Sequence, residues 1–365
     1  MPSTSPPTTT PAAKPAPAWS RLKRLFGGGR VAATSPWPSL GVVPDRPLPQ
    51  LSDYALQHVI ARNERATIYR ATERTTGELV ALKTVRIGHR DSADRGLWRE
   101  RFLRESAAAA RLKHDYIVRV HAGGVQGEPE ALTGWLAMEW VHGTDMSRYA
   151  TRNRLLPEGV VLAIAGRVAL ALDFAHRAGI VHRDVKPSNV LFDPTTGTVK
   201  VTDFGSARVA DTAATRSGLI MGTPAYMAPE QLAGAETTPQ CDLYALGVML
   251  FELLTGQRPF QADSMGDLLA RIAHQSPPHL RTLRPDLPPL LDQIVGRLLA
   301  KEPQMRQADG HQVALELRLA RSHCEAAKPG SAAAEWVDTS PGEDPEDEPP
   351  NAAPETRAFQ GTIDD

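Results

Sequence analysis

Two short motifs near the middle of the chain contain the residue types that chemistry on phosphate requires. The first is the stretch HRDVKPSN, which begins at His182, and the second is a DFG tripeptide, which begins at Asp203. Asp184 can orient a hydroxyl group and accept its proton, and Lys186 can stabilise charge on a phosphoryl group in transfer. Asn189 and Asp203 offer oxygen ligands to magnesium, which is usually held by one or two carboxylates plus substrate phosphates. Together the motifs predict phosphoryl transfer to a hydroxyl.

Further signals stand before and after these motifs, and the order of the whole set is informative. Asn189 lies five positions after Asp184, and Asp203 lies nineteen positions after it. A strand-like run that ends in Lys83 precedes them, and the segment Gly222–Glu230 follows. A single motif of this kind is often only a turn or a solvated lysine. The ordered set, however, resembles the eukaryotic-like Ser/Thr protein kinases, especially the bacterial ones.

This resemblance implies both a fold and a function. The fold is α+β and bilobal, protein-kinase-like, with a small β-rich N-lobe, a larger α-helical C-lobe and the nucleotide between them. The expected activity is that of a serine/threonine protein kinase, which transfers the γ-phosphate of ATP to Ser/Thr hydroxyls of protein substrates. Mg²⁺ is the expected metal, with Mn²⁺ as an alternative. Lys186 favours Ser/Thr over tyrosine specificity, as in the family.

The resemblance also assigns catalytic roles to individual residues. Lys83 is implied to contact the α- and β-phosphates, with a helix carboxylate as its ion-pair partner. Glu105 matches the position of that partner, and Glu100, on a different helix face, is the alternative. The expected catalytic residues are therefore Lys83, Glu105, Asp184 and Lys186, and the expected metal ligands are Asn189 and Asp203.

The stretch Leu136–Val141 resembles the hinge that joins the two lobes. Met138 would stand behind the adenine, and backbone groups of Glu139 and Val141 would hydrogen-bond its edge. Each apolar residue taken alone has core packing as its ordinary role. The other residues that the resemblance assigns to the nucleotide are Ile60, Ala61, Asn63, Ile68, Ala81, Lys83 and Leu191.

The loop expected to cover the phosphates departs from the family pattern. Kinases use a glycine-rich turn there, because glycine lets backbone amides approach phosphate without a Cβ in the way. In this chain the three glycine positions hold Ala61, Asn63 and Ala66. Asn63 can adopt a left-handed conformation, and each alanine adds only a methyl group. We therefore expect a more crowded loop and weakened ATP binding, with transfer retained because the polar catalytic groups are all present.

The segment from Asp203 to Glu230 resembles an activation segment. Arg183 directly precedes the catalytic aspartate, which is typical of kinases whose segment is ordered by phosphate on a loop residue. Thr215 and Ser217 are the expected regulatory phosphorylation sites, and autophosphorylation of this segment is expected.

Two other functions remain open beside the kinase interpretation. A pseudokinase-type signalling scaffold with weak or no transfer would explain why the phosphate loop lacks its glycines. A small-molecule kinase is a second alternative, since related folds phosphorylate antibiotics or choline. The intact segment Gly222–Glu230, which shapes a peptide-binding platform in protein kinases, argues against the small-molecule alternative.

Hydrophobic spacing predicts the elements that must position these residues. Apolar residues at helical spacing predict one helix between Pro157 and Gly179 and another from Asp242 to Leu254. A third helix is expected over Trp98–Leu112. Strand-like segments are expected at Thr67–Ala71, Glu78–Val85, Ile180–Val181 and Val199–Val201.

Two further pairings are implied as architecture rather than chemistry. Glu230 is expected to form a buried ion pair with Arg306, which would tie the activation segment to the C-lobe. Asp242 is expected to accept hydrogen bonds from backbone amides of the catalytic loop.

Composition divides the chain into three parts. Residues 1–50 are rich in Pro, Ser, Thr and Ala and are expected to be disordered, and residues 325–365 form an acidic tail with eleven acidic and two basic residues. The kinase domain is expected over 54–324, with the N-lobe at 54–138, the hinge at 139–143 and the C-lobe at 144–324. A net charge of −1 over 365 residues gives no indication of nucleic-acid binding.

The chain is expected to be cytoplasmic and to have no transmembrane segment. Its longest apolar run, around Leu243–Leu254, is interrupted by Glu252 and is too short to span a bilayer. Only two cysteines are present, which suits a reducing compartment. The basic and apolar stretch Trp19–Phe26 is interpreted as a linker or as a small amphipathic helix. A phosphopeptide-binding partner of the tails is an alternative to a plain solvated tail.

Overall fold

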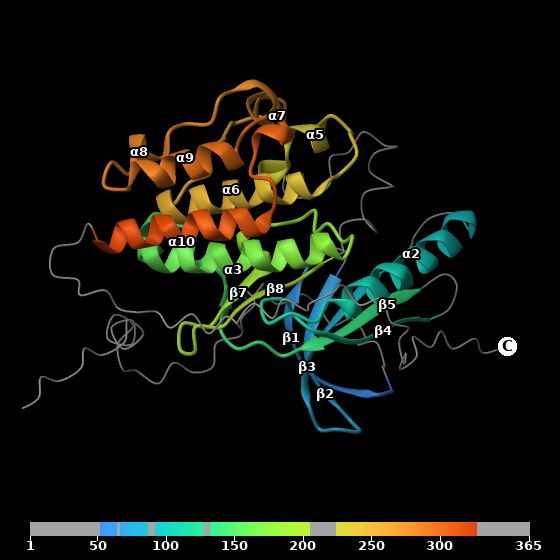
Figure 1. Cartoon of the computed structure of the whole chain (residues 1–365). Helices are drawn as coiled ribbons and strands as arrows, with labels where there is room; N and C mark the ends of the chain where they lie inside the picture. Colours follow the sequence, from blue (N-terminus) through green and yellow to red (C-terminus); the bar gives the residue numbers. More distant parts are fainter. Residues whose placement is uncertain (1–51, 64–65, 87–91, 128–131, 205–223, 327–365) are drawn as a thin grey trace, which may run out of the picture.

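The computed structural model describes residues 52–63, 66–86, 92–127, 132–204 and 224–326. Within these residues the chain forms a strand-rich N-lobe and a helical C-lobe (Figure 1). The α+β bilobal fold predicted from the sequence is confirmed. The tails at 1–51 and 327–365 lie outside the described residues, so the expectation that they are disordered stays a prediction.

The N-lobe is a five-stranded antiparallel sheet in the order β1-β2-β3-β5-β4. Its strands are β1 Tyr54–Arg62, β2 Ala66–Glu73, β3 Leu79–Arg86, β4 Val120–Gln126 and β5 Thr133–Glu139. One helix, α2 Ser92–Arg111, lies along the sheet (Figure 1). Its Phe102 packs directly on Gly134 of β5, where an added Cβ would lie 2.7 Å from the phenyl ring. This close contact fixes the helix that carries Glu105 against the sheet that carries Lys83.

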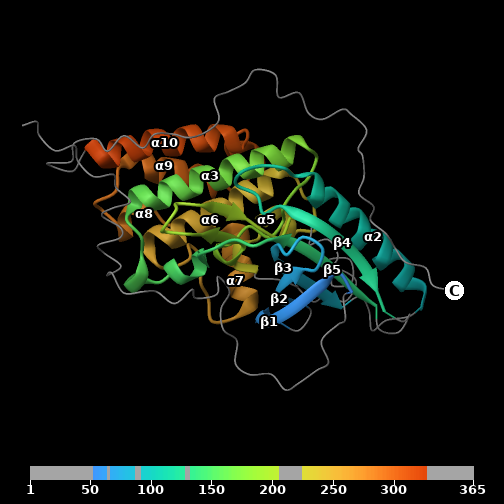
Figure 2. The same cartoon turned by 90° about the horizontal axis from the view of Figure 1, so that it is seen from below.

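The C-lobe consists of helices packed around a single apolar core. The helices are α3 Glu158–Arg177, α5 Pro229–Leu232, α6 Pro239–Thr255, α7 Met265–His274, α8 Leu280–Leu283, α9 Pro289–Leu298 and α10 Gly310–Ala326. Helix α6 is apolar around most of its circumference and is almost entirely buried, as expected for a central helix. Helix α10 runs beside α3 in both views (Figures 1 and 2).

Helix α3 is the one described helix that is long and apolar enough to cross a membrane. The longest apolar run noted in the sequence is a different segment, Leu243–Leu254. Eleven residues of α3 are buried, and the helix packs against α6 and α10. Its apolar composition is therefore explained by its place in the C-lobe core.

A small sheet of three short strands lies where the two lobes meet. Its strands are β6 Thr144–Asp145, β7 Val190–Phe192 and β8 Val199–Val201, in that order. A parallel bridge joins Val201 to Ile117, which precedes β4 of the N-lobe. Gly143 ends the hinge with a φ of 110°, and a Cβ there would lie 2.2 Å from the Phe192 carbonyl oxygen. Only glycine fits this crossing point.

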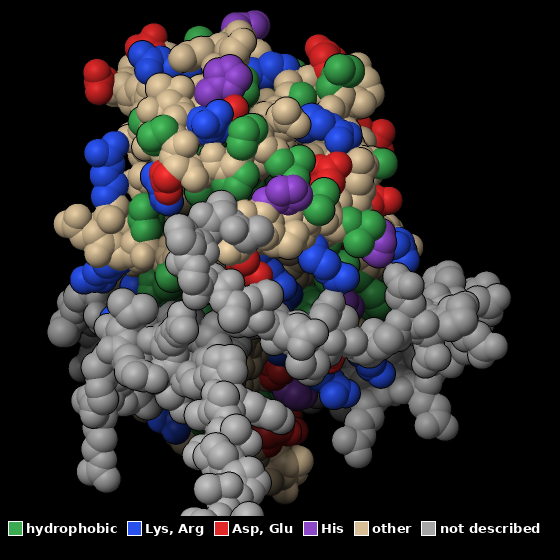
Figure 3. All heavy atoms as spheres, turned by 60° about the vertical axis from the view of Figure 1, so that its left-hand side comes forward, with side chains coloured by type: hydrophobic (Ala, Val, Ile, Leu, Met, Phe, Trp, Pro, Cys, Tyr) green, Lys and Arg blue, Asp and Glu red, His purple; other side chains and the backbone are tan. Residues whose placement is uncertain are grey.

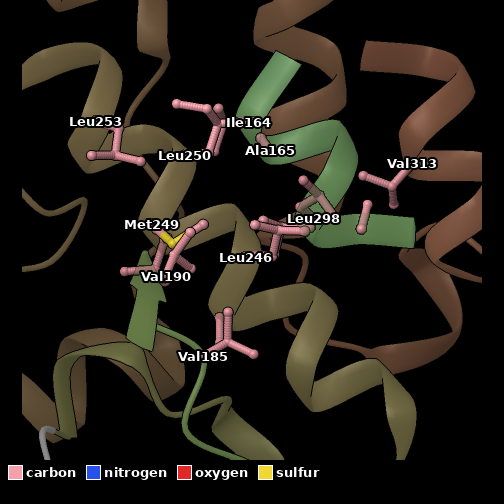
Figure 4. Close-up of a cluster of buried hydrophobic side chains, with 14 of the residues drawn as sticks. Ile164, Ala165, Val185, Val190, Leu246, Met249, Leu250, Leu253, Leu298 and Val313 are labelled. Carbon is pink, nitrogen blue, oxygen red and sulfur yellow. The ribbon is translucent and has the colours of Figure 1, made fainter. Parts of the chain in front are cut away.

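The catalytic loop packs on the apolar core of the C-lobe. Val185 and Val190, on either side of the loop, are both fully buried. In the close-up of this core they lie beside Leu246 and Met249 of α6 (Figure 4). Because Val185 directly follows Asp184, its burial restricts where the Asp184 side chain can point.

Two sequence-based expectations about elements are wrong in detail. Ile180–Val181 is not a strand, because the backbone amides that follow it bind the carboxylate of Asp242 rather than a neighbouring strand. Helix α2 begins at Ser92, six residues before the expected start at Trp98.

Acidic and basic side chains are interspersed on the C-lobe face seen in Figure 3. This distribution agrees with the near-zero net charge of the sequence.

Candidate active site

Asp184, Lys186 and Asn189 form one hydrogen-bonded group in the catalytic loop. Lys186 Nζ donates to both carboxylate oxygens of Asp184, at 2.9 and 2.6 Å. Asn189 Nδ2 donates to Asp184 Oδ2 at 3.0 Å and to its backbone oxygen at 2.7 Å. The Asp184 side chain is only half-buried. The carboxylate is therefore fixed in direction but still reachable by a substrate hydroxyl.

Asp242, in the first turn of α6, holds the backbone of this loop. Its Oδ2 accepts from the His182 N–H at 2.8 Å, and its Oδ1 accepts from the Arg183 N–H at 2.7 Å. Its Oδ2 also lies 2.8 Å from His176 Nε2. Asp242 is 1% exposed, so these contacts replace the water that the carboxylate loses. The predicted contact between Asp242 and the loop amides is confirmed.

Arg183 and Asp203 are the only non-glycine residues with positive φ in the described part of the chain, each at 70°. This left-handed conformation is costly for residues with a Cβ, and it commonly occurs at functional sites where surrounding contacts enforce it. At Arg183 the enforcing contact is the hydrogen bond from its N–H to Asp242. The strain falls on the residue directly before Asp184 and on the second predicted metal ligand.

His182 connects the two motifs. Its Nδ1 accepts from the Asp184 N–H at 3.2 Å, and its Nε2 donates to the Thr202 carbonyl oxygen at 2.9 Å. The imidazole is fully buried and packs edge-on against the Phe204 ring, with the centroids 4.5 Å apart. The Thr202 N–H in turn donates to the Asn189 carbonyl oxygen at 2.9 Å. The two motifs, whose aspartates Asp184 and Asp203 are nineteen positions apart, are thereby held as one unit.

Lys83 and Asp203 meet across the junction of the lobes. Lys83 Nζ lies 2.7 Å from Asp203 Oδ1, and both side chains are largely buried. Burial by itself would raise the pKa of Asp203, but the positive charge and hydrogen bond of Lys83, helped by His182 and Lys186, lower it overall. The carboxyl group is therefore ionised at neutral pH.

Lys83 does not form the ion pair with Glu105 that the sequence predicted. Its ammonium binds Asp203 instead, while Glu105 lines the same small cavity between α2 and the sheet. The cavity, of about 50 Å³, also borders Ser106, Met138 and Phe204. Glu100, the alternative partner, pairs with Arg104 on the exposed face of α2. The structure therefore places Glu105, and not Glu100, beside Lys83, although the pair itself is not made.

The residues predicted to surround adenine come together in one apolar cluster. All of its predicted members are buried, and they come from the N-lobe sheet, the hinge and β7: Ile60, Ile68, Ala81, Met138, Val141 and Leu191. Ala61 packs at the edge of the cluster. The Glu139 side chain is bound by Lys200 Nζ at 2.7 Å and by the Arg119 N–H at 2.8 Å. The prediction for Glu139 concerned only its backbone, which was expected to bind the edge of the adenine, and its side chain is engaged by these two other partners.

The backbone and hydrogen bonds of Asn63, in the loop expected to cover the phosphates, differ from the expectation. Asn63 does not adopt the left-handed conformation that the sequence suggested for it. Instead it forms two hydrogen bonds with Ala66, one through its backbone and one through its side chain. The glycine-like flexibility expected of Asn63 is thus replaced by a side-chain contact. Residues 64–65 lie outside the described part.

The two predicted metal ligands suit magnesium. Both donors of the Asn189 amide are directed to Asp184, so its Oδ1 must point to the other side, and this oxygen accepts no hydrogen bond among the described residues. The lowered pKa of Asp203 means that its carboxylate is ionised and can also serve as a ligand. One carboxylate and one amide oxygen form an incomplete set, as magnesium sites that are completed by phosphates require. No group of three or more His, Cys, Asp or Glu side chains within the described ranges forms a fuller metal cage.

The end of the activation segment is anchored as predicted. Arg306 Nη1 and Nη2 lie 2.6 and 2.8 Å from the two oxygens of Glu230, and the Arg306 side chain is 0% exposed. This bidentate ion pair confirms the predicted contact. Thr215 and Ser217 lie outside the described residues, so their regulatory role stays a prediction.

Two polar groups near the site were not identified from the sequence. Asp145 of β6 pairs with Leu191 in the sheet register, at the floor of the predicted adenine cluster, and burial raises its pKa. Tyr226 donates its hydroxyl to Glu252 of α6 beneath the segment that follows Thr223. Tyr226 lies within the segment Gly222–Glu230, but the motif gave its hydroxyl no role, and Asp145 belongs to none of the motifs used above. For Asp145, an acidic residue two positions after the hinge glycine is the signal that could have been used.

Comparison with known proteins places this geometry in a wider group. The sequence matches the model of the protein kinase domain over residues 54–315. It is 37% identical over 259 residues to serine/threonine-protein kinase PknA of Mycobacterium tuberculosis, an alignment that covers 70% of this chain and 58% of that protein. It is 36% identical over 275 residues to serine/threonine-protein kinase pkn3 of Myxococcus xanthus, which covers 73% of this chain and 49% of that protein. The chain thus spans about half the length of the curated relatives it matches.

Solved structures give the same result for the fold. The crystal structure of the M. tuberculosis PknI kinase domain aligns with a TM-score of 0.58 at 31% sequence identity. The alignment covers 74% of this chain and 96% of the PknI domain.

Proposed function

The chain belongs to the protein kinase family, and we propose that it transfers the γ-phosphate of ATP to serine and threonine hydroxyls of proteins. The observation that carries this proposal is the fixed position of the Asp184 carboxylate, held by Lys186 and Asn189 at 2.6–3.0 Å. The names of relatives such as PknA support the Ser/Thr protein class.

The proposed reaction uses these side chains in distinct roles. The substrate hydroxyl oxygen attacks the γ-phosphorus while the bond from that phosphorus to the β–γ bridging oxygen breaks, and ADP leaves. Asp184 orients the hydroxyl and accepts its proton, for which its half-exposed carboxylate is accessible. Lys186 lies beside that carboxylate and stabilises negative charge on the phosphoryl group in transfer.

Binding of the nucleotide uses the groups at the junction of the lobes. Lys83 holds the α- and β-phosphates, and the apolar cluster around Ile68 and Leu191 receives the adenine. Asn189 and Asp203 would hold magnesium, which would supply positive charge to neutralise the phosphates. Because Lys83 and Asp203 pair directly, nucleotide binding must separate them and give each a new partner.

The ionised carboxylate of Asp203 and the orientation of Asn189 favour an active kinase over a pseudokinase. A scaffold without transfer has no need for the strained backbone at Arg183 and Asp203 or for the network that joins His182 to both motifs. We further propose that the segment Asp203–Glu230 is autophosphorylated, at Thr215 or Ser217.

The test of this function is label transfer from γ-labelled ATP with magnesium. The protein would be incubated with a generic protein substrate, and in separate reactions with choline and an aminoglycoside, beside the Asp184→Asn variant. We expect labelled phosphoserine and phosphothreonine on protein, and label on the kinase itself at Thr215 or Ser217. Label on a small molecule alone would establish a small-molecule kinase, and no label on any acceptor at any ATP concentration would establish a pseudokinase.

We also propose that the protein acts in a reducing, ATP-containing compartment such as the cytoplasm. Both cysteines, Cys241 and Cys324, are buried and are thiols rather than disulfide-bonded. Burial raises the pKa of Cys241 to about 12, which makes it unreactive. Fractionation of cells that produce the full-length protein tests this location.

A phosphopeptide-binding partner of the tails is a separate proposal. It is tested by whether a phosphorylated tail peptide captures a protein that the unphosphorylated peptide does not.

A further inference from the structure

The turn between β1 and β2 is closed by two hydrogen bonds between Asn63 and Ala66. The Asn63 N–H donates to the Ala66 carbonyl oxygen at 2.9 Å, as in an ordinary hairpin turn. The Ala66 N–H donates to Asn63 Oδ1 at 2.8 Å. The second bond depends on the asparagine side chain, and a glycine at this position could not make it.

This turn leads into β2, the strand that pairs with the β3 strand carrying the expected phosphate-binding lysine. Ala66 begins β2, and Ile68, two residues later, pairs directly with Lys83 on β3. Lys83 reaches Asp203 at the junction of the lobes. Backbone N–H groups of a turn placed over a triphosphate are the donors such a loop offers to phosphate oxygens.

Asn63 Oδ1 and a phosphate oxygen are both hydrogen-bond acceptors, and the single Ala66 N–H can serve only one of them with good geometry. We propose that Asn63 is a built-in competitor of the phosphates: its side-chain oxygen occupies the Ala66 N–H, and bound nucleotide must displace it. This inference rests on the proposed function, because it takes the nucleotide polyphosphate as the ligand of this loop.

The inference separates two explanations for weak ATP binding. If the Cβ at position 63 merely crowds the phosphates, removing the side-chain oxygen alone changes nothing. If the hydrogen bond competes, removing that oxygen is sufficient even when the Cβ remains. The penalty also applies only to ligands that carry β- and γ-phosphates, because adenosine does not reach this turn.

The experiment measures dissociation constants by titration calorimetry for adenosine and for a magnesium complex of a non-hydrolysable ATP analogue. Wild type is compared with Asn63→Ala, which keeps the Cβ, with Asn63→Gly, and with Asn63→Asp, which keeps an acceptor and adds negative charge. Asn153→Ala, at an exposed position in the C-lobe, is the matched control. Thermal unfolding of each variant checks that the β1–β2 turn still folds.

We expect Asn63→Ala to bind the ATP analogue about two- to tenfold more tightly than wild type, the usual range for one hydrogen bond. Asn63→Asp should bind it more weakly, and adenosine affinity should be the same in all variants. The inference is overturned if Asn63→Ala leaves analogue affinity unchanged, if only Asn63→Gly tightens it, or if adenosine affinity changes equally.

Failure of the inference can be told apart from failure of the proposed function. If wild type binds the analogue and transfers label but Asn63→Ala binds no more tightly, only the competition by Asn63 is refuted. If neither wild type nor any variant binds the analogue, the proposed function is refuted and the competition with it.

Discussion

Lys83 of the N-lobe sheet and Asp203 of the C-lobe form a 2.7 Å ion pair that joins the two lobes. The pair links the residue expected to bind the α- and β-phosphates to a residue expected to bind the metal. The proposed function would therefore give each side chain two successive partners, first the other residue and then the nucleotide complex.

Replacing Lys83 should reduce transfer strongly. We expect Lys83→Met to lower kcat/KM for ATP by about 100- to 1,000-fold, the range seen when one preorganised electrostatic contact is lost from an active site. Lys113→Met, at an exposed position, is the control. Steady-state rates at several ATP concentrations measure the effect. Retention of more than half of the wild-type value would contradict the role given to Lys83.

The role of Glu105 is tested separately, because its predicted pair with Lys83 is not made. If Lys83 changes partner from Asp203 to Glu105 when nucleotide binds, Glu105→Gln should lower kcat about tenfold or more, since the lysine would then be poorly positioned. Glu100→Gln, on the exposed face of the same helix, should have no effect. Equal effects of the two variants in the same transfer assay would refute the assignment of Glu105.

Asp242 should act on the rate rather than on nucleotide binding. In Asp242→Asn one acceptor oxygen becomes a donor that faces the N–H groups of His182 or Arg183. Misplacement of the loop should lower kcat by about 100-fold while KM for ATP changes little. Asp263→Asn, on the surface, is the control. A change in KM without a change in kcat would place Asp242 outside this role.

The Glu230–Arg306 ion pair should contribute to stability in a pH-dependent way. Glu230→Gln leaves a buried guanidinium without its carboxylate, so the free energy of unfolding at pH 7 should fall by about 3 kcal/mol. Chemical denaturation measures this value, with the exposed Glu236→Gln as the control.

The direction of the pH dependence follows from the pKa of Glu230. Burial alone would raise this pKa, but the hydrogen bond and charge of Arg306 lower it overall. A carboxyl group with a lowered folded-state pKa contributes its full stability above its unfolded pKa and loses it as pH falls through the folded pKa. The difference between wild type and Glu230→Gln should therefore be constant near neutral pH and shrink in acid. A difference that grew on acidification would refute this account.

The sequence predicted which residues converge, because motif order and spacing carry that information. Asp184, Asn189 and Asp203 were placed in one site by their motifs and by the resemblance to Ser/Thr kinases, and the network through His182 explains why the order and spacing of those motifs matter. The adenine cluster was also predicted correctly as a set of residues that meet. In each case the information lies in residue identity at a fixed distance along the chain.

The sequence could not predict features that depend on side-chain direction or on packing between distant segments. It allowed Asn63 a left-handed backbone, whereas in the structure the Asn63 side chain accepts a hydrogen bond that closes the turn. No strand was predicted at β4, because its two glycines lower strand propensity. In the structure Trp135 of the neighbouring strand β5 packs over Gly124, a contact between strands that local sequence does not reveal. The sequence also named Glu105 as the partner of Lys83. Spacing along the chain does not reveal that the Lys83 ammonium binds Asp203 instead of Glu105.

The central claim is that the group around Asp184 performs phosphoryl transfer, and one comparison tests it most directly. Rates of label transfer and dissociation constants for magnesium-ATP would be measured for wild type and Asp184→Asn. We predict that the rate falls by about 100- to 10,000-fold, the usual contribution of a general base, while the dissociation constant changes by less than about twofold. Transfer by Asp184→Asn at the wild-type rate would contradict the claim.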